Sequence, residues 1–107
     1  MSDVERVLER AIENLPGHWY QGDLVDDEEN PTKWCSIGHL ARAGAELGLY
    51  YGLAARALKG VIGAPVDQRL VGGLGSVAEW NDHPDRLESE VIDTFKQALY
   101  NAQHPDE

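Results

Sequence analysis

Apolar residues recur at helical spacing in four stretches of this 107-residue chain, and this periodicity restricts the fold more than any other feature. The first stretch, residues 2–15, and the last, about 87–102, each carry one narrow apolar stripe. The stripe positions are Val4, Val7, Leu8, Ala11, Ile12 and Leu15, and Val91, Ile92, Phe95, Ala98, Leu99 and Ala102. We therefore expect the first and last helices to pack together.

Two further helices are predicted in the middle of the chain. Ser36 is a suitable N-cap for a helix over 37–47, and a second helix follows over about 50–62. Gly38 and Gly44 weaken the first of these helices, so we expect a neighbouring backbone to approach closely there.

Residues 18–35 contain two aromatic segments on either side of a polar loop with five acids between Asp23 and Glu29. This arrangement predicts a small β-hairpin or an ordered loop with a solvated acidic tip. Residues 64–71 are consistent with a short helix, and the glycines at 72, 73 and 75 with a flexible joint. Ser76 is expected to cap a short helix through Trp80, followed by a turn over 81–84.

The sequence thus predicts a mainly α single domain over residues 1–107, a compact bundle of four to five helices with a small β-hairpin after the first helix. Its parts are a helix over 1–15, a hairpin or ordered loop over 18–35, a helical region over 36–103 and a tail over 104–107.

Nineteen acidic residues against nine Lys and Arg give a formal net charge of −10. This charge disfavours direct nucleic-acid binding and favours a basic protein partner or imitation of a phosphate track, while solubility alone also explains it. The single cysteine, the absence of a signal-peptide pattern and the absence of a membrane-length apolar run predict a cytoplasmic protein.

Cys35 and His39 are the candidate catalytic residues, because a thiol at a helix N-terminus with a histidine one turn later begins a nucleophilic site. Asp82 or Asn81 would orient the histidine. Burial of a free cysteine in the core is the structural alternative. No cofactor or metal is expected, because neither these residues with His18 and His83 nor the acids at 26–29 have metal-ligand spacing.

A binding surface is predicted from aromatic and polar residues in the loop and before the last helix. Its members are Trp19, Tyr20, Trp34, Trp80, Asn81 and Asp82. The alternative is that the aromatic rings fill the space between the hairpin and the helices, while Asn81 and Asp82 hold a turn.

Three segments, at 19–22, 34–40 and 80–84, read Trp-Tyr-Gln-Gly, Trp-Cys-Ser-Ile-Gly-His-Leu and Trp-Asn-Asp-His-Pro. Their order resembles a family of short uncharacterised proteins from actinobacteria and their bacteriophages, which read Trp-Cys-x-Gly, Cys-x-x-Gly-Ala-Leu and Trp-Asn-Asp-x-Pro. The resemblance implies no activity. Tyr20 stands where the family commonly has cysteine and His39 where it has alanine. Leu87 stands in place of threonine, so Asp85 or a neighbour is expected to cap the last helix.

Three functions follow as hypotheses. The first is a small acidic protein-interaction module that binds a host protein or a second copy of itself, and the resemblance implies a phage-encoded protein as one origin. The second is a cysteine-dependent hydrolase or transferase that uses Cys35 and His39. The third is a nucleic-acid mimic whose acids, Asp23–Glu29 and Glu79–Asp93, form one continuous track.

Overall fold

The computed structural model describes residues 1–63 and 74–105, with the backbone alone at 74–76. It contains five helices: α1 (Asp3–Asn14), α2 (Ser36–Leu47), α3 (Gly52–Ile62), α4 (Leu74–Asn81) and α5 (Glu88–Gln103). The short helix and most of the flexible joint expected between 64 and 73 lie outside the described residues. No described helix is both long and apolar enough to cross a bilayer.

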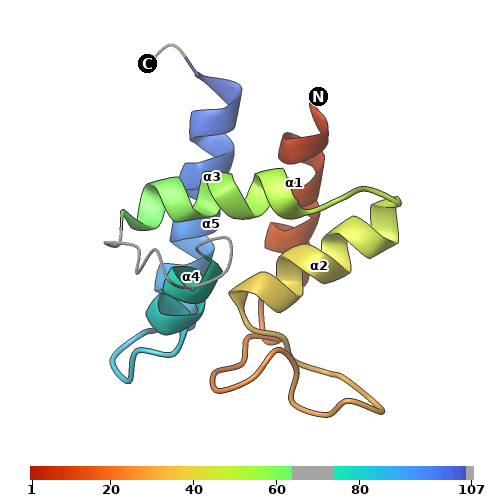
Figure 1. The fold of residues 1–107 in the computed structure, drawn as a ribbon, viewed down its shortest axis with the longest axis vertical. Coiled ribbons are helices and arrows are strands. Elements are labelled where there is room, and N and C mark those ends of the chain that lie inside the picture. Colours follow the sequence, from red (N-terminus) through yellow and green to blue (C-terminus); the bar gives the residue numbers. More distant parts are fainter. Residues whose placement is uncertain (64–73, 106–107) are drawn as a thin grey trace.

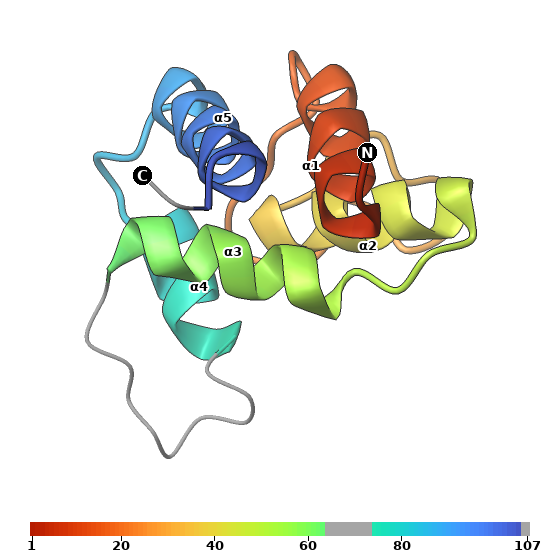
Figure 2. The same cartoon turned by 90° about the horizontal axis from the view of Figure 1, so that it is seen from above.

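The first and last helices pack together, as expected. α1 and α5 lie side by side with opposite directions, and α3 crosses the pair (Figures 1 and 2). α4 packs against α2 and α3. The buried apolar residues form one core: Val7, Leu8, Ala11, Leu15, Cys35, Ile37, Leu40, Ala43, Ala54, Ala55, Leu58, Val77, Val91, Phe95 and Ala98.

The helix ends show which sequence signals decided local structure. Ser2 caps α1, since its Oγ accepts a hydrogen bond from the Glu5 N–H at 3.2 Å. α2 is capped by Cys35 rather than Ser36, because the Cys35 Sγ accepts from the Gly38 N–H at 3.3 Å. At α5 the Asp85 cap is wrong: the Glu90 carboxylate instead accepts from the Leu87 N–H at 3.1 Å.

Gly38 and Gly44 allow a close approach of backbone, which confirms the expectation for both. A Cβ at Gly38 would lie 2.6 Å from the carbonyl oxygen of Leu24, and one at Gly44 would lie 2.6 Å from that of Leu49. The first contact seats the loop on α2. The second lets the chain reverse tightly between α2 and α3.

The predicted β-hairpin is wrong, because residues 18–35 form an ordered loop. Trp34 makes an isolated parallel bridge to Trp19 and an isolated antiparallel bridge to Val25. Each of these bridges is a single residue pair, so neither extends into a ladder of paired residues. No strand occurs among the described residues. The loop and the α4–α5 connection lie at the same end of the molecule, opposite the N-terminus (Figure 1).

Candidate functional site

Asn81, at the end of α4, joins the loop, α2 and α4 through its buried side-chain amide. Its Oδ1 accepts hydrogen bonds from the Trp19 indole N–H at 2.7 Å, the Ser36 N–H at 2.9 Å and the Ser36 hydroxyl at 2.6 Å. Its Nδ2 donates to the carbonyl oxygen of Tyr20 at 3.0 Å. Because these partners come from the loop and from α2, the asparagine fixes both segments against the end of α4.

Asp82 and Gln21 extend this network to the next residues of the loop. The Asp82 Oδ1 accepts from the Gly22 N–H at 3.0 Å and from the Asn81 amide at 2.9 Å. The Gln21 amide donates to the carbonyl oxygens of Asn81 and His83 at 2.9 and 2.8 Å. The Trp19–Gly22 segment is therefore held against the end of α4 by side chains and backbone alike.

The predicted binding residues are only partly brought together. Trp19, Tyr20, Asn81 and Asp82 share the network, but Asn81 is buried and thus positions other groups. Trp34 lies under Arg42, whose guanidinium carbon is 4.0 Å from the ring centroid. The Trp80 ring is covered in the same way by Arg86 at 4.2 Å. Each of the two rings therefore makes a separate cation–π contact with a nearby arginine.

The Cys35 thiol lacks the activation expected at a helix N-terminus. Burial raises its pKa, which outweighs the opposite effect of the hydrogen bonds from Gly38 and Ile37. The side chain is only 6% exposed. The expectation of a lowered thiol pKa is therefore wrong, because the residue that caps α2 also belongs to the core.

His39 is fully buried and faces the loop. Its Nε2–H donates to the carbonyl oxygen of His18 at 2.8 Å, which leaves the lone pair on Nδ1. That Nδ1 has no hydrogen-bond partner among the residues that the structure describes. Burial lowers the pKa of the imidazole to about 4, so it is neutral at pH 7. His39 and Cys35 are joined by the backbone hydrogen bond from the His39 N–H to the Cys35 carbonyl oxygen. Among the described residues, no hydrogen bond joins their side chains.

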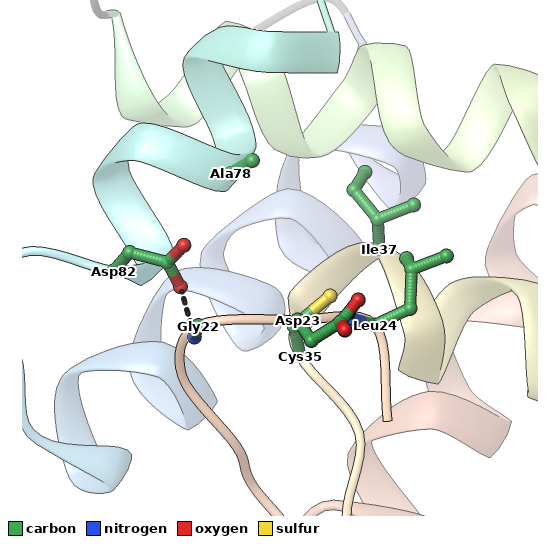
Figure 3. A pocket seen from close by; sticks show the side chains of 7 residues that line it. All are labelled: Gly22, Asp23, Leu24, Cys35, Ile37, Ala78 and Asp82. Atoms are coloured by element: carbon green, nitrogen blue, oxygen red, sulfur yellow. Dashed lines mark hydrogen bonds between the residues drawn. The ribbon is translucent and has the colours of Figure 1, made fainter. Parts of the chain in front are cut away.

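A pocket of about 360 Å³ opens between the loop, α2 and α4. Ala78 lines it from α4 and Asp82 from the residue after that helix, whereas Cys35 and Ile37 line it from the start of α2 (Figure 3). The loop contributes Gly22, Asp23 and Leu24. The sequence predicted Asp82 as a binding residue and Cys35 as a catalytic candidate, and it included Asp23 only in the acidic run. The other lining residues were missed, because they are apolar or glycine and carry no local signal of a site.

The pocket combines an apolar lining with two carboxylates. Leu24, which lines the edge of the pocket, is 54% exposed. Asp82 uses its Oδ1 for the loop, and Asp23 uses its Oδ1 to accept from the Leu24 N–H at 2.7 Å. Within the described part of the chain, the second oxygen of each carboxylate has no hydrogen bond and neither residue forms an ion pair.

Other acids of the loop hold its backbone. The Asp26 Oδ1 accepts from the Thr32 and Lys33 N–H groups at 2.9 and 3.1 Å, while its Oδ2 accepts from the Thr32 hydroxyl. These hydrogen bonds hold the Asp26 pKa well below its usual range, and the bond from the Thr32 hydroxyl has the largest effect. Asp27 similarly accepts from the Glu29 N–H at 2.9 Å. The described residues contain no cluster of His, Cys, Asp and Glu suited to a metal ion.

Fold and site together define a small all-α domain with a loop fixed by one buried asparagine and a pocket between acidic side chains. The chain belongs to a family of unknown function, DUF6197, whose model matches residues 1–101. Comparison with curated proteins and with solved structures found no significant match.

Proposed function

We propose that this protein is an acidic interaction module that binds a basic protein partner at the end formed by the loop and α4. The observation that carries this proposal is the pocket, in which the exposed Leu24 side chain lies beside two carboxylates. Buried apolar contacts with a charged rim are typical of sites that bind another protein. The net charge of −10 attracts a basic partner and repels a second copy of the chain.

The fixed loop supports binding as well. A loop that is already ordered loses little conformational entropy when a partner binds, so more of the contact energy appears as affinity. Here the Asn81 and Asp82 hydrogen bonds hold the pocket side of the loop before any partner arrives. The geometry does not favour a Cys35–His39 hydrolase, since no hydrogen bond joins the two side chains among the described residues and burial raises the pKa of the Cys35 thiol.

A random peptide library displayed on yeast tests the proposal with the full-length protein as the labelled probe. We expect enrichment of peptides with lysine or arginine next to apolar residues, and weaker binding at higher ionic strength. Leu24→Ser should reduce the bound fraction by about fivefold. Leu87→Ser is the matched control, because Leu87 is similarly exposed but does not line the pocket, and it should have little effect.

Two results would contradict the proposal. One is that no peptide of the library is enriched above the background signal of display cells to which no labelled protein was added. The other is an equal loss of binding in Leu24→Ser and Leu87→Ser, which would show that general surface hydrophobicity, and not the pocket, retains the peptides.

A further inference from the structure

We propose that the pocket between the loop and α4 receives an arginine side chain, which would be the anchor residue of the basic partner. This inference rests on the proposed function and names the chemistry that the same site recognises. It is carried by the lining of the pocket and by the two carboxylates that face it from different elements (Figure 3).

The size and lining of the pocket suit the stem of a long side chain. Its volume of about 360 Å³ is at the lower end of the roughly 300–1,000 Å³ that small-molecule sites occupy. Leu24, Ile37 and Ala78 present aliphatic carbon on two sides of it. Long cationic side chains lay their methylene groups along such surfaces and keep the charged head in a polar place.

The polar groups of the pocket suit a guanidinium head. Asp23 from the loop and Asp82, the residue after α4, each keep one carboxylate oxygen without a partner among the described residues. A guanidinium has five N–H donors in a planar fork, so it can donate to two separate carboxylates at once. It is also less strongly hydrated than an ammonium group, which lowers the cost of entering a partly apolar pocket.

The carboxylates are held in place before binding. Gly22 and Asn81 donate to Asp82, and the Leu24 N–H donates to Asp23. Such fixed acceptors lose little freedom when a cation arrives. Asp23 is the better position to test, because Asp23→Asn removes the charge and retains an oxygen for the Leu24 N–H. Asp82 is the poorer position, because its Oδ1 accepts from both Gly22 and Asn81, so a change of charge there also alters two hydrogen bonds that hold the loop.

The test is an NMR titration of the full chain with Nα-acetyl-arginine amide at constant ionic strength. We expect saturable shifts of the backbone amides of Gly22, Asp23, Ala78 and Asp82. The citrulline amide, which has the same shape without the charge, should bind about fivefold or more weakly. The lysine amide should also bind more weakly. Asp23→Asn should weaken arginine binding by about threefold or more, whereas Asp93→Asn, an exposed acid outside the pocket, should not.

A second variant tests the pocket without any change of charge. Ala78→Gln places a longer side chain on the exposed α4 surface that lines the pocket, so it should abolish saturable binding while the rest of the spectrum stays unchanged. The inference is overturned by shifts that do not saturate, by equal affinity for citrulline or lysine, or by binding that survives Ala78→Gln.

The outcome is separable from that of the proposed function. Pocket-dependent peptides that lack arginine would overturn this inference and leave the interaction module in place. Saturable arginine binding with no enriched peptide would overturn the interaction module and leave the arginine site in place.

Discussion

The Asn81 side-chain oxygen accepts hydrogen bonds from both the backbone N–H and the hydroxyl of Ser36, at 2.9 and 2.6 Å. The two residues are 45 positions apart, and both are buried. The serine expected to cap α2 thus faces α4 instead. A buried acceptor with three donors stabilises the fold strongly, because each donor would lose its partner if the oxygen were removed.

Asn81→Leu should therefore lower the free energy of unfolding by about 3 kcal/mol, since the Trp19 indole and both Ser36 donors would be buried without acceptors. Urea denaturation followed by tryptophan fluorescence measures this change. Asn101→Ala, on the exposed side of α5, is the control and should change stability by less than about 0.5 kcal/mol. Similar losses in the two variants would contradict the role of Asn81.

Gly38→Ala should destabilise the protein by about 1–3 kcal/mol, because the new Cβ would lie 2.6 Å from the Leu24 carbonyl oxygen and force the loop away from α2. Gly60→Ala is the matched helical control. A Cβ there meets nothing within 4 Å, so this variant should be more stable by about 0.5–1 kcal/mol. Thermal unfolding of both variants should show stability changes of opposite sign. A stabilising effect of Gly38→Ala would refute the close approach of the loop to α2.

Stability should decrease as the pH falls from about 6.5 to about 4 because of His39. Its pKa is about 4 in the folded protein against 6.5 for the ordinary imidazole, so the unfolded chain binds the proton first in this range. The contribution amounts to at most about 3 kcal/mol. Below this range the lowered pKa of Asp26 causes a further loss of stability, because the unfolded chain binds a proton at that carboxylate before the folded protein does.

Urea titrations at several pH values of wild type, His39→Gln and His104→Gln measure this dependence. His39→Gln should flatten the slope between pH 6.5 and 4, whereas His104→Gln, at the exposed C-terminal end of α5, should keep it. An unchanged slope in His39→Gln would show that another group is responsible.

The Cys35 thiol should react with iodoacetamide about tenfold or more slowly in the folded protein than in urea at pH 8, because burial restricts access and raises the thiol pKa. Mass spectrometry of quenched samples gives both rates. Rapid alkylation of the folded protein at neutral pH would contradict this expectation and restore the cysteine-dependent hydrolase as a hypothesis.

The helices were predictable because their signals are local. The apolar stripe of the last helix, which includes Phe95 and Ala98, and the serine cap of α1 depend on residues within a few positions of one another. The glycine pattern of α2 also predicted a close contact correctly, although it left the contacting segment unidentified. Periodicity and capping therefore gave the helical fold to within a few residues at each end.

The loop and the site were not predictable to the same degree, since long-range contacts decide them. Aromatic residues around an acidic run are typical of a hairpin, but Trp34 pairs with Trp19 on one side and Val25 on the other. The sequence left Cys35 either as a nucleophile at a helix start or as a buried core residue, and only its 6% exposure in the folded chain shows that it belongs to the core. The pocket needs three segments to be in place before it exists.

The hydrogen bond between Trp19 and Asn81 spans 62 positions and therefore sets an order of events during protein synthesis. A ribosome adds about 5–20 residues per second, so Trp19 waits roughly 3–12 s before its acceptor has even been made. During that interval the nascent loop lacks the asparagine that holds it. The pocket is therefore completed only after Asn81 has left the exit tunnel.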